Sequence, residues 1–184
     1  GLVWPRDQLA EVLAAARALG MAAHLDGARL RNAAAALGVP VAELAGGFDT
    51  VVVSLSKGLG APVGSLLCGS RDFVRAARRW RKVLGGGMRQ SGLLAAAGLY
   101  ALEHNVARLA EDHANAAVLA NALRALSDVQ VDPARVQTNM VFMTPKAGTA
   151  HALTAHLAQH GILVDPGTTI RMVTHLDVTR ADVE

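Results

Sequence analysis

The stretch from Val51 to Gly64 constrains this chain more than any other, because it joins a buried strand to a turn that carries a lysine. It reads VVVSLSKGLGAPVG. Three consecutive β-branched residues are typical of a strand buried on both faces, and the glycines and proline after them predict a tight turn. Lys57 is one of only three lysines in the chain. It follows the strand at the place where open α/β sheets hold their ligands.

The composition is that of a globular protein with one domain and room for a smaller second one. Of the 184 residues, 52% are hydrophobic and 18% are charged, which is enough to build an apolar core. No apolar run reaches the ~20 residues of a membrane-spanning helix, and the first residues lack the pattern of a signal peptide. Cys68 is the only cysteine, so we expect no disulfide framework and a cytoplasmic location.

The net charge of +3 originates mostly in one short basic segment. Its basic residues are Arg71, Arg75, Arg78, Arg79, Arg81 and Lys82. Most of them share the spacing of one helix face, which is typical of a solvated or subunit-contacting surface. The alternative is a non-catalytic module that binds nucleic acid through this helix, with salt-sensitive affinity and no cofactor. We favour the first interpretation and expect neither a nucleic-acid nor a membrane partner.

Helices and strands alternate along the first half of the chain. The expected elements are a helix between Pro5 and Gly20, a strand over 21–25, a helix over 29–37 and strands over 50–55 and 64–68. This alternation predicts an α/β sheet with crossover helices. A flexible joint at 85–87 precedes a long helix over 88–126, with breaks allowed near Gly98 and Asn105.

The pattern beyond the long helix predicts a small α+β domain. The expected elements are strands over 129–131, 140–143, 162–164 and 170–173 and a helix over 149–160. We place the boundary inside the long helix, roughly within 105–127, and divide the chain into domains 1–110 and 111–184. Thr179 and Asp182 form an N-cap signature close to the last residue, and the first helix has no strand before it. We therefore expect the chain to be part of a larger subunit.

A carboxylate, Asp26, accompanies Lys57. Lysine forms a Schiff base with carbonyl cofactors, and pyridoxal 5'-phosphate works as an electron sink only while its ring nitrogen stays protonated. Asp26 ends the preceding strand, so both groups would emerge at one edge of a parallel sheet, and its charge would favour the protonated ring. Ser54 and Ser56 flank the lysine and suit the cofactor phosphate or the positioning of Lys57.

Taken singly, these residues are also compatible with simpler roles. An Asp-Gly pair alone is often a turn, and a lysine after a strand is often a solvated loop residue. Nucleotide-binding motifs are disfavoured, because a P-loop has glycine where this chain has Ser56, and the glycines miss the G-x-G-x-x-G spacing by one residue.

His24 shares a strand face with Asp26, and we expect a buried, hydrogen-bonded histidine rather than a partner of Asp26. We expect no metal site, because His156 and His160 lack a third ligand.

Three motifs resemble the low-specificity L-threonine aldolases of the β-eliminating lyase family. They are HLDGAR at 24–29, SLSKGLGAPVG at 54–64 and LGGGMRQ at 84–90, in this order and spacing. Weaker similarity extends to 138–141 and 170–175, so the resemblance covers essentially the whole chain. It implies the aspartate-aminotransferase-like fold of pyridoxal-phosphate enzymes (fold type I), with part of the large mixed-sheet domain and a small C-terminal α+β domain.

The resemblance also implies roles for individual residues. Lys57 would be the Schiff-base lysine and Asp26 the partner of the pyridinium nitrogen. Arg29 and Arg171 would bind the substrate carboxylate, for which a planar guanidinium is the chemical match. Lys82 and Arg89 match basic positions near the cofactor phosphate, reached across a subunit interface in a dimer or tetramer. For Arg171 and Lys82, an ordinary surface residue is an equal alternative.

The implied reaction is the retro-aldol cleavage of L-threonine, L-allo-threonine and related β-hydroxy amino acids to glycine and an aldehyde. Another pyridoxal-phosphate lyase or an aminotransferase would share Asp26 and Lys57 and cleave a different bond. The family's ring-stacking histidine, its candidate base and its phosphate-binding turn belong to an N-terminal part outside these 184 residues. We therefore expect the isolated chain to be weakly active or inactive.

Overall fold

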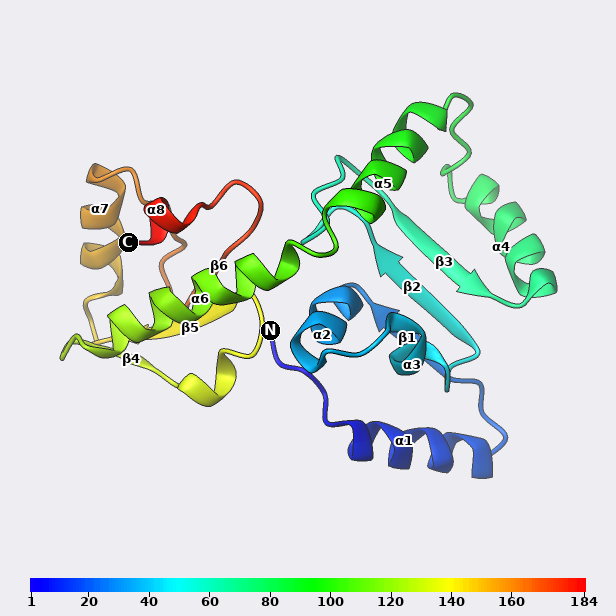
Figure 1. The fold of residues 1–184 in the computed structure, drawn as a ribbon, viewed down its shortest axis with the longest axis horizontal. Helices are drawn as coiled ribbons and strands as arrows, with labels where there is room; N and C mark the ends of the chain where they lie inside the picture. Colours follow the sequence, from blue (N-terminus) through cyan, green and yellow to red (C-terminus); the bar gives the residue numbers. More distant parts are fainter. The chain divides into compact units, whose positions relative to one another are not determined.

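The computed structural model describes residues 1–184, which form two compact units. The lysine unit comprises residues 4–108, and the C-terminal unit comprises residues 1–3 and 109–184. Each unit contains its own three-stranded sheet (Figure 1). No helix in either unit combines the length and the apolar character that crossing a membrane requires.

The lysine unit is a mixed α/β structure, as predicted. Its elements are α1 (Arg6–Ala18), β1 (His24–Gly27), α2 (Leu30–Leu37), α3 (Val41–Ala45), β2 (Thr50–Ser54), β3 (Ser65–Gly69), α4 (Arg71–Val83) and α5 (Gly92–His104). The strands lie in the order β1-β2-β3, with β1 parallel and β3 antiparallel to β2. The strand that precedes the lysine is therefore the central one, which suits its run of β-branched residues.

One face of this sheet is covered by α2 and α3. Val51 on β2 packs with Leu30 and Leu44 in a cluster of buried residues, and Leu25 and Val53 lie against it. Because side chains along a strand alternate between faces, the residues between these positions point to the opposite face. The sequence pattern of the strands thus decides which side chains lie away from the helices.

The first strand begins later than the sequence predicts. The strand expected from Met21 starts at His24, where pairing with Thr50 begins. The backbone N–H of Met21 instead donates to the carbonyl of Ala16 at 2.9 Å and closes the end of α1, with Gly20 at a φ of 66°. A helix cap of this kind occupies backbone groups that a strand would need.

The C-terminal unit is a small α+β structure. Its elements are α6 (Leu109–Arg124), β4 (Val129–Val131), the 3₁₀ turn η1 (Pro133–Arg135), β5 (Met140–Pro145), α7 (Ala150–Gln159), β6 (Ile170–Val173) and α8 (Arg180–Val183). The antiparallel strands lie in the order β4-β5-β6. Ala116 and Ala120 of α6 pack with Val141 of β5, so α6 covers one face of the sheet.

Two predicted elements differ in this part of the chain. The strand expected at 162–164 is wrong, because the N–H of Ile162 donates to the carbonyl of Leu157 at 3.0 Å and belongs to the cap of α7. The long helix expected over 88–126 is two helices, α5 and α6, and it starts at Gly92. The break allowed near Asn105 is present, because α5 ends at His104, whereas the one allowed near Gly98 is absent, because Gly98 lies inside α5.

The N-cap signature near the last residue is confirmed. The hydroxyl of Thr179 accepts the N–H of Asp182 at 3.2 Å, and the carboxylate of Asp182 accepts the N–H of Thr179 at 2.8 Å. These bonds form a reciprocal capping box at the start of α8. The hydrogen bonds from Thr179 hold the pKa of the Asp182 carboxyl below its ordinary value.

Candidate functional site

Asp26 lies on the sheet face that α2 and α3 leave open. It pairs in register with Val52 on the parallel strand β2, and its neighbours Leu25 and Gly27 turn to the other face or carry no side chain. One carboxylate oxygen accepts the N–H of Ala28 at 3.0 Å, which fixes the side chain at the strand end. The other oxygen has no hydrogen-bond partner in the structure, so an anionic acceptor is exposed toward solvent.

Gly27 permits the close pairing of the strands beside this carboxylate. A Cβ atom at Gly27 would lie 2.4 Å from the carbonyl oxygen of Val52, closer than any real contact. The Asp-Gly sequence is therefore more than a turn signal here, because the glycine lets β1 approach β2 where Asp26 must project.

Lys57 stands in a loop that also contains three buried apolar residues. Leu55, Leu59 and Ala61 are 7%, 3% and 6% exposed, whereas Lys57 itself is exposed. The carbonyl of Lys57 accepts the N–H of Gly60 at 2.9 Å and closes a tight turn. The buried residues anchor this turn, and the amine of Lys57 has no hydrogen bond or ion pair.

The predicted positions of Asp26 and Lys57 are the ones that the structure shows. Each side chain lies at or just beyond the carboxyl end of one of two neighbouring parallel strands, β1 and β2. An open α/β sheet binds ligands at this edge. The chemical roles given to the two residues remain predictions.

The remaining candidates of the lysine unit lie in three places. Ser54 ends β2 opposite Ser65, and Ser56 is exposed directly before the lysine. Lys82 is in the last turn of α4, and its aliphatic chain occupies the space where a side chain at Gly87 would stand, with Cδ 2.4 Å from such a Cβ. Arg89 is exposed in the loop between α4 and α5.

The two arginines expected to bind a carboxylate belong to different units. Arg29 is the N-cap residue of α2, three residues after Asp26 in the lysine unit. Arg171 is exposed on β6 of the C-terminal unit, opposite Phe142, and its guanidinium has no hydrogen bond or ion pair. Arg29 therefore belongs to the same unit as Lys57, whereas Arg171 belongs to the C-terminal unit.

His24 is exposed, which corrects the expectation that it is buried. Its Nδ1 lies 2.8 Å from the hydroxyl of Thr50 on the neighbouring strand, so the expected hydrogen bond is present. The difference arises because β1 is an edge strand and His24 points to the face that the helices do not cover.

One contact of the lysine loop was not predicted from the sequence. The side-chain amide of Asn105 donates to the carbonyl of Leu59 at 2.7 Å, across 46 residues of sequence. The sequence marked Asn105 only as a place where a helix breaks. Which carbonyl such a residue binds depends on how α5 packs, and no local pattern contains that information.

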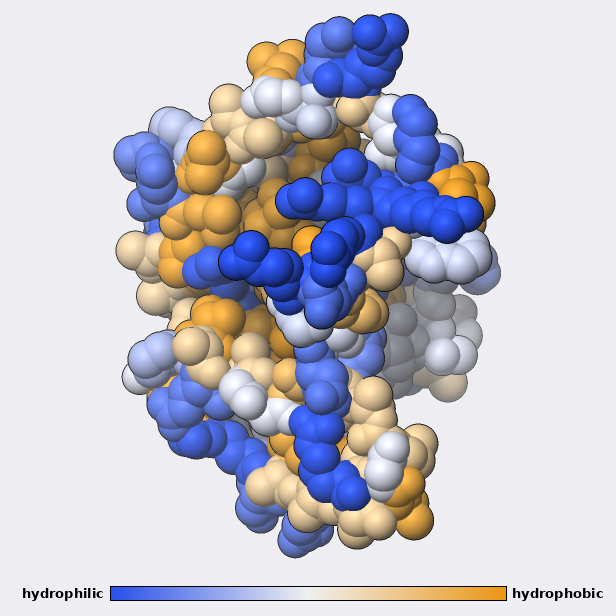
Figure 2. Space-filling view, turned by 90° about the vertical axis from the view of Figure 1, so that its right-hand side faces the viewer, coloured by the Kyte–Doolittle hydropathy of each residue, from blue (hydrophilic) through white to orange (hydrophobic).

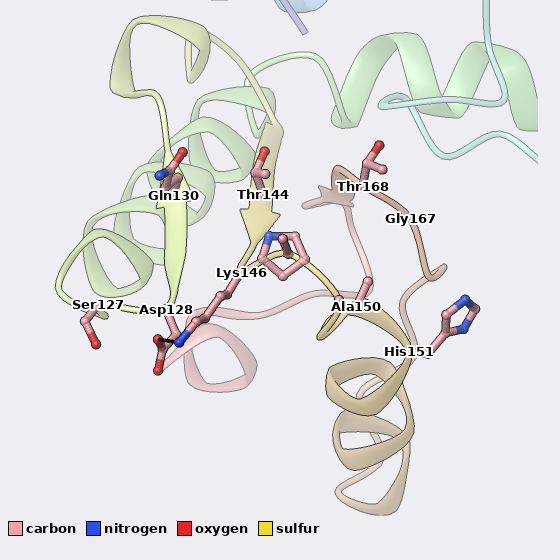
Figure 3. Close-up of a pocket in the computed structure, with 12 residues that line it drawn as sticks. Ser127, Asp128, Gln130, Thr144, Lys146, Ala150, His151, Gly167 and Thr168 are labelled. Atoms are coloured by element: carbon pink, nitrogen blue, oxygen red, sulfur yellow. Dashed lines mark ion pairs between the residues drawn. The ribbon is translucent and has the colours of Figure 1, made fainter.

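A pocket in the C-terminal unit lies apart from these residues. It has a volume of about 950 Å³, and residues of β4, β5 and α7 line it together with the adjoining loops. Figure 3 shows Lys146 directed toward Asp128 on one side, where the two charged groups are 3.8 Å apart, and His151 on the other side. None of the predicted site residues lines this pocket, so it is not the candidate site.

Large apolar side chains remain exposed on the lysine unit. They are Leu66 and Leu67 of β3, Trp80 and Val83 of α4, Leu84, and Leu93, Leu99 and Tyr100 of α5. Figure 2 shows hydrophobic surface between long hydrophilic side chains on the side of the molecule where α4 lies. Exposed apolar surface of this kind is typical of an interaction face.

A family comparison decides to which group of proteins this site belongs. Residues 1–146 match the family described as beta-eliminating lyase. The chain belongs to this family. It is 48% identical over 180 residues to a low specificity L-threonine aldolase of Escherichia coli K12, covering 98% of this chain and 53% of that protein. A low-specificity L-threonine aldolase of Arabidopsis thaliana is 48% identical over 169 residues, covering 89% of this chain and 47% of that protein.

Solved structures show that this family member has the expected fold. A protein of Exiguobacterium, described as a candidate aromatic amino acid β-eliminating lyase or threonine aldolase, matches with a TM-score of 0.84 at 23% identity and covers 100% of this chain. A threonine aldolase of Leishmania major matches with a TM-score of 0.75 at 20% identity and covers 94%. The chain spans 54% and 52% of these structures, about half, as it does of the relatives by sequence.

Proposed function

We propose that this chain forms the lysine-bearing part of a pyridoxal-phosphate-dependent low-specificity L-threonine aldolase. The enzyme cleaves L-threonine, L-allo-threonine and related β-hydroxy amino acids to glycine and an aldehyde. The observation that carries the proposal is the position of an amine without a partner, Lys57, and a carboxylate, Asp26, at the carboxyl ends of two adjacent parallel strands. The identity of 48% to named aldolases supports the substrate class.

The residues at this edge suit the cofactor. The amine of Lys57 is exposed and unpaired, as a group that must bind an aldehyde has to be. The free oxygen of Asp26 can accept a hydrogen bond from the N–H of the protonated ring, and its negative charge favours the protonated form of the ring. When bound, pyridoxal phosphate supplies an electron sink for the electron pair released at the substrate Cα. Ser54 and Ser56 are hydroxyl donors beside the lysine for the phosphate or for orienting Lys57.

The substrate needs a group that holds its carboxylate and orients its Cα. Arg29 and Arg171 would do this, because a guanidinium donates two parallel hydrogen bonds to a carboxylate and thereby fixes its plane. A fixed carboxylate restricts rotation about Cα, so that the bond to be broken keeps one orientation.

The complete enzyme would be a cytoplasmic dimer or tetramer with shared active sites. The exposed apolar residues of β3, α4 and α5 support an extended contact surface. Lys82 and Arg89 are exposed near one end of this surface, where their charges could reach a cofactor phosphate of a neighbouring subunit.

Replacement of Lys57 tests the proposal directly. In the complete enzyme, Lys57→Ala should abolish the visible absorbance of lysine-bound cofactor and reduce cleavage of L-allo-threonine to background. The matched control is Lys146→Ala, which removes the exposed lysine beside Asp128 and should leave both measurements unchanged. A Lys57→Ala enzyme that keeps the absorbance would refute the assignment.

Product analysis separates this function from its nearest alternative. An aldolase releases glycine and an aldehyde, whereas an aminotransferase or another lyase of the same fold yields a keto acid, with ammonia when the reaction is an elimination. Equimolar glycine and acetaldehyde from L-threonine are expected. A keto acid as the main product would exclude the aldolase and leave the cofactor assignment intact.

A further inference from the structure

The lysine loop is held by a small number of specific bonds. The N–H of Gly60 closes the turn on the carbonyl of Lys57, and the N–H of Ala61 donates to the carbonyl of Leu55 at 3.0 Å. These backbone bonds define the shape of the turn. The buried side chains of Leu55, Leu59 and Ala61 anchor the turn, and an attachment to a neighbouring helix fixes its position further.

The helix α5 supplies that attachment at two points. At Gly98, a Cβ atom would lie 3.0 Å from Cδ1 of Leu55, so the glycine lets the helix approach the residue two positions before Lys57. Two turns further along, the amide of Asn105 donates to the carbonyl of Leu59 at 2.7 Å. One face of α5 carries both contacts, because Gly98, Ala101 and Asn105 have the spacing of a single helix face. Gly98 and Ala101 on this face are buried.

Asn105 also lies at the end of α5, close to the end of the lysine unit. It is the residue that ends α5, where its backbone N–H donates to the carbonyl of Ala101 at 3.0 Å. The lysine unit itself ends three residues later, at Arg108. The side chain that binds the lysine loop therefore belongs to the segment that connects the two units.

We propose that Asn105 is a positioning residue for Lys57. Its amide holds the carbonyl of Leu59, two residues beyond the lysine, and so sets the direction in which the amine leaves the sheet. An amide fits this role because it donates a hydrogen bond without a charge, and Leu59 is 3% exposed, so solvent does not readily replace a missing donor. This inference rests on the proposed function of Lys57.

The test compares Asn105→Ala with Asn105→His in the complete enzyme. Asn105→Ala removes the donor, whereas the ring nitrogen of histidine can place a donor at the same distance from the backbone. We expect Asn105→Ala to slow the loading of pyridoxal phosphate onto Lys57, followed by visible absorbance, and to lower kcat for L-allo-threonine about tenfold, since small misplacements of reacting groups cost up to ~10²-fold. KM should change less than about twofold, because the substrate contacts stay intact. Asn105→His should recover most of both losses.

Asn121→Ala is the matched control, because Asn121 is exposed on α6 and makes no side-chain hydrogen bond. It should load cofactor and turn over like the wild type. A folded Asn105→Ala enzyme with wild-type loading and kcat overturns the inference, and so does one that loses only thermal stability. If Asn105→Ala does not fold, a folded Asn105→His enzyme that fails to load cofactor overturns it. A wild type without cofactor absorbance would instead refute the proposed function, so the two failures are distinguishable.

Discussion

At the scale of residues, the two carboxylate oxygens of Asp26 have different surroundings. One oxygen accepts the N–H of Ala28, and the other is free to face a ligand. Asp26→Asn keeps the first bond and removes the charge, so we expect a folded enzyme with kcat lowered by about 10²-fold or more, the usual loss when a charge-stabilising group is removed. Steady-state kinetics with L-allo-threonine measure the effect.

The control for this change is Asp177→Asn. Asp177 has an 85% exposed side chain in the C-terminal unit, and its replacement should leave kcat within about twofold because exposed ion pairs contribute little. A wild-type kcat in Asp26→Asn would show that the site does not need a negative charge at the ring nitrogen.

At the scale of elements, Asp49 connects α1 with the start of the sheet. Its carboxylate accepts the N–H of Ala23 and a hydrogen bond from Arg17, both at 2.7 Å. These two groups hold the pKa of the Asp49 carboxyl below its ordinary 3.8. In the unfolded chain the carboxyl binds its proton more readily, so the stabilisation is complete above pH 3.8 and disappears as the pH falls through the lowered pKa.

This linkage predicts how Asp49→Asn behaves. At neutral pH the variant should have a smaller free energy of unfolding than the wild type, and the difference should vanish in acid, as measured by urea unfolding at a series of pH values. The exposed Asp165, which makes no hydrogen bond or ion pair, serves as the control, and Asp165→Asn should show no such dependence. A constant difference at every pH would assign the effect to packing.

At the scale of the molecule, the chain spans 53% of its Escherichia coli relative. We predict that the isolated 184 residues cleave L-allo-threonine weakly or not at all, because the resemblance assigns the ring-stacking histidine and the base to a part outside them. A coupled aldehyde assay compares the chain with the complete enzyme. Turnover by the chain that matches the complete enzyme would contradict the prediction.

Features that depend on neighbours within a few residues could be predicted from the sequence alone. Strand propensity, turn chemistry and helix capping all act locally. They made it possible to predict the strand before Lys57, the Asp-Gly pair at the end of β1 and the helix cap at Thr179. The positions of Asp26 and Lys57 at one sheet edge followed from the rule for parallel strands.

The contacts between groups that are distant in sequence depend on how the chain folds and could not be predicted from local patterns. Residues 162–164 are apolar and still form no strand, because a strand needs a partner and the N–H of Ile162 is used by a helix cap. The exposure of His24 and the bond from Asn105 to Leu59 likewise depend on packing between segments far apart in sequence. Lys57 could therefore be found from the sequence, whereas the group that holds its loop in place could not.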